Sequence, residues 1–278
     1  MKLYTVDAGR FKLDGGAMFG VVPKSIWQRT NPADARNLCT WALRLLLIED
    51  GDRLILIDTG IGDKQSEKFF SFIEPENTDI TQALAVHGFH PEDITDVFLT
   101  HLHFDHVGGA IKREEDKLVP TFPNARYWSN EQHWNWALQA NPREKASFLP
   151  ENLLPLEASG QLHFITNNNA RDFHPEIRIR YAFGHTDAMM LPQITYKGKT
   201  ILYMADLLPS VGHIPLPYIM SYDMFPLKTL EERKSYWKEI VDKDYILFLE
   251  HDPLHVCCTL QETEKGIRLK DTFSLADI

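Results

Sequence analysis

Two apolar runs near residue 50 are the clearest strand signal in the chain. Residues 42–48 and 53–57 are almost entirely aliphatic, and the polar turn Glu49-Asp50-Gly51-Asp52 separates them. Short apolar runs joined by a glycine-containing turn are typical of a hairpin of buried strands. We therefore predict a β-hairpin here. Residues 96–99 have the same apolar character and predict a further short strand.

The rest of the chain alternates between strand and helix patterns. A capping residue followed by helical periodicity predicts helices at 78–86, 129–139 and 227–241. Apolar runs predict strands at 176–183, 193–197, 199–204 and 245–249. Three prolines and little periodicity predict an irregular, lid-like stretch at 141–155. Two groups of strands, each followed by helices, fit two packed sheets covered by helices. We predict one layered domain over residues 1–278, with an insertion or lid around 111–160.

Composition narrows the class of protein. The chain has 278 residues, of which 44% are hydrophobic, so it can bury a substantial core. Its formal net charge of −10 provides no general attraction to nucleic acid or to anionic lipid, and we expect neither as a partner. Three cysteines, Cys39, Cys257 and Cys258, argue against a disulfide framework. No apolar stretch is long enough for a signal peptide or a membrane span, which predicts a cytoplasmic protein.

The strongest chemical signal follows the strand predicted at 96–99. His101, His103, Asp105 and His106 place three imidazoles and one carboxylate within six residues. Side chains two positions apart in extended chain point the same way, so His101 and His103 can bind one metal ion together. Beyond the turn, Asp105 and His106 face a different point, which suits a second ion. These donors suit Zn²⁺, although iron, manganese and cobalt are chemically compatible.

The order His-x-His-x-Asp-His followed by Gly108-Gly109 resembles the signature of metallo-β-lactamase-fold hydrolases. The resemblance extends over roughly residues 45–252. It implies an α+β fold, a four-layered αββα sandwich with metals in a cleft at one edge of its sheets. It also implies two divalent metal ions, with Zn²⁺ expected.

The resemblance extends to later motifs and supplies the remaining ligands. His185 lies in Gly-His-Thr, Asp206 follows an apolar strand and would bridge both ions, and His251 would complete the second site ahead of its neighbour His255. Asp58, in Asp-Thr-Gly, would orient a ligating histidine. The full set of implied metal ligands is His101, His103, Asp105, His106, His185, Asp206 and His251.

The family pattern is broken at one point. Asp187-Ala188 stands where a Pro-Gly pair is usual after the Gly-His-Thr motif. The shape of this loop is therefore in question more than the ligand itself.

Two metal ions that share a water lower its pKa to about 7 and supply a bridging hydroxide. This hydroxide would attack the electrophilic centre of a small ester-type substrate, such as a lactone, an aryl ester or a phosphotriester. Asp105 would be the catalytic residue that accepts a hydrogen bond from the hydroxide and passes a proton to the leaving group.

Two groups in the family are the nearest candidates for the substrate. Quorum-quenching lactonases share the length and the ligands, but they place a tyrosine three residues after the bridging aspartate, where this chain has Pro209. Tyr218 or Tyr222 could substitute for it, and His213 in the same loop could reach the cleft.

The other candidate group is similar to methyl parathion hydrolase. The stretch at 14–20 and the Phe- and Trp-rich segments look more like this group. They suggest an apolar pocket lined by Phe19, Trp27, Phe104 and Ile214. Ordinary core packing is the alternative for each of these residues.

Three alternative functions remain to be distinguished from a dinuclear ester hydrolase. A glyoxalase II-like enzyme would need a C-terminal helical domain, for which residues 252–278 are too few. A sulfur-dioxygenase-like enzyme would hold a single iron. A non-catalytic metal-binding protein would tend to lose ligands, whereas all seven are present. A small-molecule substrate is expected in every enzymatic case, and a homodimer is expected by analogy with relatives.

Overall fold

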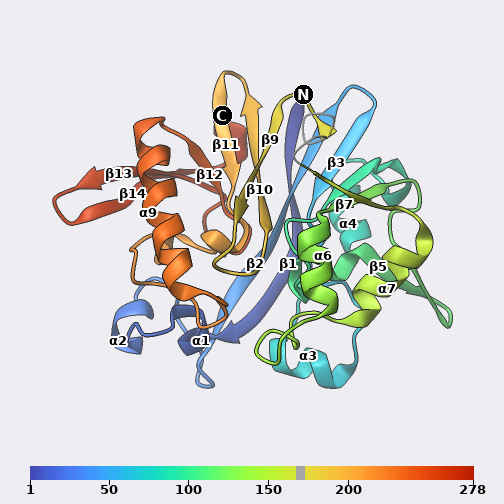
Figure 1. Ribbon diagram of the computed structural model, residues 1–278, viewed down its shortest axis with the longest axis horizontal. Coiled ribbons are helices and arrows are strands. Elements are labelled where there is room, and N and C mark those ends of the chain that lie inside the picture. The colour runs from blue at the N-terminus through green and yellow to red at the C-terminus, as the bar shows by residue number, and fades with distance from the viewer. Residues whose placement is uncertain (167–172) are drawn as a thin grey trace. The chain divides into compact units, whose positions relative to one another are not determined.

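The computed structural model describes residues 1–166 and 173–278 of the chain (Figure 1). The chain divides into two compact units. The first unit comprises Met1–Arg10 and Leu43–Phe173, and the second comprises Phe11–Ala42 and His174–Ile278.

One six-stranded sheet contains most strands of the first unit, and β5 (Ile111–Glu114) and β6 (Lys117–Pro120) form a separate two-stranded sheet. The order of the six-stranded sheet is β1 (Lys2–Asp14), β2 (Leu38–Asp50), β3 (Arg53–Ile57), β4 (Asp96–Phe98), β7 (Arg126–Ser129) and β8 (Leu162–Phe164). Strands β2 and β3 form the predicted antiparallel hairpin, and β3, β4, β7 and β8 are parallel. Both β1 and β2 continue into the second unit. The predicted hairpin and the strand before His101 are therefore present.

The other elements of the first unit lie between the strands of its six-stranded sheet in the sequence. They are α3 (Glu67–Ile73), α4 (Ile80–Ala85), η1 (Pro91–Asp93), α5 (Phe104–Val107), η2 (Gly108–Ala110), the hairpin β5 (Ile111–Glu114) and β6 (Lys117–Pro120), α6 (Glu131–Leu138) and α7 (Pro150–Ser159). Helix α6 begins later than predicted, because residues 126–129 form β7 and the side chain of Asn130 caps the helix. The region expected to be irregular contains the start of α7, since a proline at the first helical position sacrifices no hydrogen bond.

A second six-stranded sheet forms the second unit. Its order is β14 (Gly266–Phe273), β13 (Cys257–Thr263), β12 (Ile246–Phe248), β11 (Lys199–Tyr203), β10 (Met189–Tyr196) and β9 (Ile177–Ala182). All neighbours are antiparallel except β11 and β12. The unit also contains α1 (Gly15–Phe19), α2 (Lys24–Trp27), η3 (Ala205–Leu207), η4 (Val211–His213), α9 (Pro226–Asp242) and η5 (Leu275–Asp277). Helix α9 was predicted. Strands β1, β13 and β14 were not.

Among the helices of the described residues, none has both the length and the apolar character that a membrane span requires.

Gly108 and Gly109 pack against the turn that follows β3. A Cβ atom on Gly109 would lie 2.1 Å from the carbonyl oxygen of Thr59, and one on Gly108 would lie 2.1 Å from that of Ile61. The Gly109 N–H also donates to Gly60 O at 2.9 Å. The two glycines therefore let the backbone after the His/Asp cluster contact the Asp-Thr-Gly turn directly.

Replacing Gly109 with alanine should lower the free energy of unfolding by roughly 2 kcal/mol or more, because the backbone of the Thr59 turn must move. Urea denaturation of the metal-free protein measures this. The control is Gly160→Ala, where nothing lies within 4 Å and only the positive φ of 74° opposes a side chain, so a cost of about 1 kcal/mol is expected. Equal losses for the two variants would contradict the proposed close contact.

Candidate metal centre

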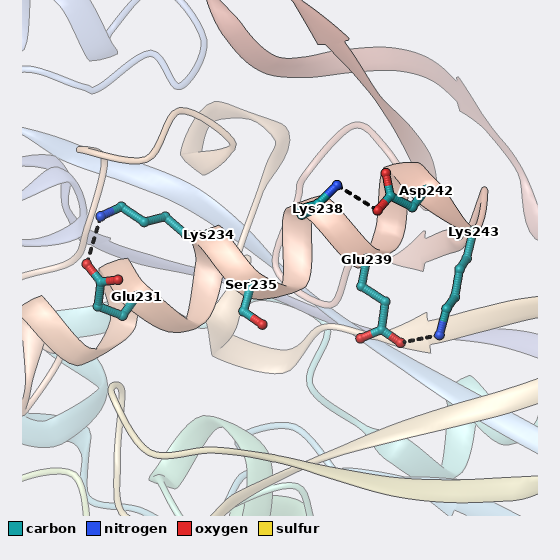
Figure 2. A pocket seen from close by; sticks show the side chains of 7 residues that line it. All are labelled: Glu231, Lys234, Ser235, Lys238, Glu239, Asp242 and Lys243. Carbon is teal, nitrogen blue, oxygen red and sulfur yellow. Dashed lines mark hydrogen bonds and ion pairs between the residues drawn. The ribbon is translucent and has the colours of Figure 1, made fainter.

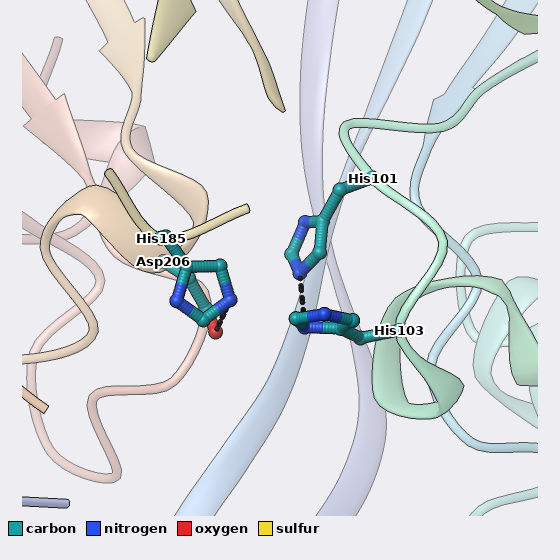
Figure 3. Close-up of side chains that lie close together, drawn as sticks. All are labelled: His101, His103, His185 and Asp206. Carbon is teal, nitrogen blue, oxygen red and sulfur yellow. Dashed lines mark hydrogen bonds and ion pairs between the residues drawn. The ribbon is translucent and has the colours of Figure 1, made fainter. Parts of the chain in front are cut away.

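In the first unit, the candidate ligands form two pairs where β4 gives way to α5. His101 lies in the extended chain after β4, and His103 is the N-terminal cap residue of α5. His101 Nε2 and His103 Nδ1 are 3.1 Å apart, and both side chains are buried (Figure 3). Asp105 and His106 belong to α5, where Asp105 Oδ2 lies 3.9 Å from His106 Nε2. His101 thus lies beside His103, and Asp105 lies beside His106.

In the second unit, Asp206 lies between two histidines. Its Oδ2 is 3.1 Å from His185 Nε2, and its Oδ1 is 3.1 Å from His251 Nε2. Figure 3 shows the His185–Asp206 pair. The three residues follow β9, β11 and β12, which run in the same direction and end at the same edge of the sheet. Each oxygen of one buried carboxylate therefore faces a different imidazole.

Hydrogen bonds assign the tautomers of the first unit's histidines. The Thr100 hydroxyl donates to Asp58 Oδ2 at 2.7 Å, so its oxygen accepts from His101 Nδ1–H at 3.1 Å. His106 Nδ1–H donates to the same Asp58 oxygen at 3.1 Å. His103 differs, because its Nε2–H donates to Glu144 at 3.0 Å. The nitrogens that remain, Nε2 of His101 and His106 and Nδ1 of His103, carry lone pairs.

The second unit's histidines are anchored in the same way. His185 Nδ1–H donates to the buried Asp223 carboxylate at 2.8 Å. His251 Nδ1–H donates to the carbonyl oxygen of Ala42 at 2.8 Å, and a carbonyl can only accept. Both Nε2 atoms consequently face the oxygens of Asp206.

This arrangement fits metal ions. In neutral rings these atoms carry lone pairs, which repel at 3.1 Å unless a metal ion or a proton lies between them, and this applies to the His101–His103 pair and to both contacts of Asp206. Neutral imidazole with its other nitrogen held by an acceptor is the usual form of a metal-binding histidine. The residues present therefore suit the divalent cations that the sequence implies.

The loop after His185 contains a residue in the left-handed conformation. Ala188 has a φ of 54°, the left-handed region that glycine favours, at the place where the family pattern has glycine. The preceding Gly184 has no room for a side chain, since a Cβ would lie 2.3 Å from Thr229 Oγ1 in α9. The backbone around His185 is thus packed closely against α9 and includes one residue in a conformation that is unfavourable for alanine.

Two other histidines near the candidate ligands in the sequence, His213 and His255, make different contacts. His213 is fully buried in the second unit, where Nδ1 accepts from Ser210 at 2.9 Å and Nε2 donates to the Met18 carbonyl at 3.0 Å. Its ring stacks on Phe19 at 4.3 Å. Both nitrogens of the His213 ring are thus engaged in hydrogen bonds within the second unit. His255 is half-buried, and its backbone N–H donates to Asp252 Oδ1.

The candidate pocket residues divide into buried and half-buried side chains. Phe19, Trp27 and Ile214 are buried in the second unit, and Phe19 stacks on Trp27 at 5.3 Å. Tyr218 is half-buried with its ring edge toward Phe19, and Tyr222 is half-buried as well. Phe104 is half-buried in the first unit.

Four residues that the sequence analysis missed support the candidate ligands. Thr100, Asp223 and Glu144 hold histidine rings, as described above. Arg233 of α9 is fully buried and donates to the carbonyl oxygens of Leu207, His213 and Tyr218. Burial lowers its pKa to about 10, which leaves it charged at neutral pH. Arg233 therefore holds the loop after Asp206, and no local pattern in the sequence indicates this.

A hollow along α9 is a surface feature of another kind (Figure 2). Its charged residues pair within the helix, as Lys234 with Glu231, Lys238 with Asp242 and Lys243 with Glu239. Balanced, mostly exposed pairs of this kind mark a solvated helix face rather than a binding site.

Comparison with known proteins identifies the family. Residues 45–251 match the Metallo-beta-lactamase superfamily. The chain belongs to the metallo-β-lactamase superfamily. The expected fold is confirmed: each unit of this metallo-β-lactamase-fold chain contributes a six-stranded sheet and its helices.

Similar proteins include lactonases. An N-acyl homoserine lactonase of Bacillus cereus is 36% identical over 119 residues, which are 39% of this chain and 43% of that enzyme. The match thus spans less than half of the lactonase. The crystal structure of a probable metal-dependent hydrolase from Staphylococcus aureus has a TM-score of 0.85 and 26% identity, covering 98% of both chains. AidC, a dizinc quorum-quenching lactonase, has a TM-score of 0.82 and 23% identity, covering 98% of this chain and 95% of its own.

His213 should make the free energy of unfolding depend on pH. Burial lowers its pKa from 6.5 to about 3, so the folded state holds the neutral ring. The stabilisation is present above the unfolded-state pKa of about 6.5 and is lost as pH falls from there toward 3. Relative to His213→Gln, the metal-free wild type should lose up to about 1.4 kcal/mol per pH unit below 6.5. Parallel stability curves between pH 7 and 5 would rule this out.

Proposed function

We propose that this chain is a metal-dependent hydrolase that binds two divalent metal ions and cleaves a small ester-type substrate, with a lactone as the first candidate. One observation carries the dinuclear part of the proposal. The two oxygens of Asp206 face two different imidazoles, which is the geometry of a carboxylate shared by two cations. The proposed ligands are His101, His103, Asp105, His106, His185, Asp206 and His251.

The division of these ligands follows from their pairing within each unit. His101 and His103 pair in the first unit, and His185 lies against one oxygen of Asp206 in the second. Asp105 and His106 pair in the first unit, and His251 lies against the other oxygen of Asp206. We assign one ion to each of these groups, with Asp206 common to both. Zn²⁺ is the proposed metal because nitrogen donors predominate.

When bound, two such ions would lower the pKa of a water to near neutrality and polarise the carbonyl of the substrate. The protein's own contribution is to hold the ligands and to handle protons. Asp105 is buried at the start of α5 and is the carboxylate that would accept a proton from the attacking water and return it to the leaving group.

A neutral substrate with an apolar part suits the chain better than a polyanion does. The net charge of −10 disfavours highly charged anions. Phe104 precedes Asp105 and meets the ring of Phe69 edge to face at 5.1 Å, which provides a half-buried aromatic surface in the first unit. The names of the relatives point to N-acyl homoserine lactones. We therefore propose a lactone with an acyl chain, with phosphotriesters and aryl esters as the other members of the panel.

Tyr218, one of the two tyrosines proposed to assist catalysis, has defined contacts in its loop. Arg233 holds its carbonyl at 2.7 Å, and its ring packs edge-on against Phe19 at 6.3 Å. Its backbone therefore has a defined position in the loop that follows Asp206.

Elemental analysis should find about two divalent metal ions per chain in the purified protein. Hydrolysis of an N-acyl homoserine lactone, a phosphotriester and an aryl ester should stop after chelation and return when metal is restored, because the attacking water depends on the ions. A chain that takes up no metal after repeated reloading would refute the proposed centre. Two bound ions with no turnover on the panel would refute the proposed substrate class.

Asp105→Asn should reduce kcat by roughly 10²- to 10⁴-fold on the best substrate of the panel, since the amide cannot accept the proton. The fold should persist, which circular dichroism and thermal unfolding can check. Asp116→Asn, an exposed aspartate in the β5–β6 turn, is the matched control and should leave kcat unchanged. Wild-type kcat in the Asp105 variant would remove its proton-transfer role.

A further inference from the structure

Glu144 is a buried acid outside the metal-binding motif. It lies between α6 and α7, and only 1% of its surface is exposed. Burying a carboxylate is costly unless hydrogen-bond donors surround it. Its partners therefore indicate what it does.

Two short side-chain hydrogen bonds and one long one reach the Glu144 carboxylate, the long one from Asn141 Nδ2 to Oε2 at 3.4 Å. His103 Nε2–H donates to Oε1 at 3.0 Å, and the indole Nε1–H of Trp136 donates to Oε2 at 2.7 Å. The turn that carries Glu144 is itself held, because Asn141 Oδ1 accepts the backbone N–H of Arg143 and of Glu144. The carboxylate thus has a defined position relative to both α6 and His103.

The same turn is joined to the start of α5. The Ser147 N–H donates to the Glu144 carbonyl at 2.8 Å, and the Phe104 N–H donates to the Ser147 carbonyl at 2.9 Å. Phe104 directly follows His103. The segment from 141 to 147 therefore holds both the backbone beside His103 and the ring of His103.

The contact with Glu144 decides which nitrogen His103 offers. The other candidate histidine ligands, His101, His106, His185 and His251, are anchored through Nδ1 and present Nε2. His103 is anchored through Nε2, so its Nδ1 lone pair faces His101. Without Glu144, the His103 ring could adopt the other tautomer, with its proton on Nδ1. Nδ1 would then have no lone pair to offer to a metal ion.

We propose that Glu144 is a positioning residue that fixes the tautomer and ring orientation of His103, with Trp136 holding the carboxylate in place. This proposal rests on the metal centre proposed above. It makes the segment between α6 and α7 part of the apparatus that sets metal affinity.

Glu144→Gln tests this with a nearly isosteric change. An amide has one oxygen, so it cannot accept from both His103 and Trp136, and its NH₂ group must face one of the two donors. We expect the affinity for Zn²⁺ to fall by about 10- to 100-fold, the usual effect of losing such a partner. Competition with a chromophoric chelator measures the dissociation constants directly and requires no substrate.

Removal of the competing donor should rescue the glutamine variant. In the double variant E144Q/W136F, the amide oxygen can turn to His103 while its NH₂ group faces the space that the indole leaves. The contact of Asn141 Nδ2 with this position is 3.4 Å long in the wild type, so little is lost when it lengthens. Zn²⁺ affinity should return to within about 3-fold of the W136F single variant, a recovery of at least about 0.7 kcal/mol from a 10-fold loss. A double variant that binds no more tightly than E144Q would overturn the proposal, because a merely structural role for Glu144 predicts additive losses.

Two further variants separate this inference from the proposed centre. Glu157→Gln, an exposed glutamate on α7, should bind Zn²⁺ like the wild type. His103→Ala should lower the number of ions bound per chain. If His103→Ala keeps the full metal content, the centre itself is wrong. If His103→Ala loses metal while E144Q binds as tightly as the wild type, only the role of Glu144 is wrong.

Discussion

The candidate centre depends on one constraint: each imidazole commits its N–H group to a fixed acceptor. Asp58, through the Thr100 hydroxyl and directly, anchors two of the rings, Glu144 and Asp223 anchor one each, and the Ala42 carbonyl anchors the last. The remaining nitrogens then carry lone pairs directed at one another or at Asp206. Buried donor atoms arranged in this way suit a bound metal ion, and the proposed centre rests on this arrangement.

The fold meets the constraint by placing ligands where strands end. In the second unit, three parallel-running strands deliver His185, Asp206 and His251 to one edge of the sheet. In the first unit, the chain turns from β4 into α5 within a few residues, and glycines allow that turn to contact the Asp-Thr-Gly backbone. Short connections leave the ligands little freedom, so little entropy remains to be lost when metal binds.

Buried charges outside the ligand set stabilise this geometry. Arg233 of α9 donates hydrogen bonds to three carbonyl oxygens of the loop after Asp206. Glu144 accepts hydrogen bonds from Trp136 of α6 and from His103. Each is a charged group whose burial is tolerable only with several partners. Their effect is to make the position of a ligand depend on a helix remote from it in the sequence.

The sequence alone determined the family, the β2–β3 hairpin, helices α4, α6 and α9 and the candidate ligands, because metal-binding residues cluster in short motifs after apolar strands. It did not reveal β1, β13 and β14, and β14 in particular is mostly half-buried or exposed and lacks a continuous apolar run. Nor did it indicate Glu144, Asp223 or Arg233. Only the tertiary structure decided these, because a hydrogen bond between residues 38 or 41 positions apart leaves no periodic trace in the chain.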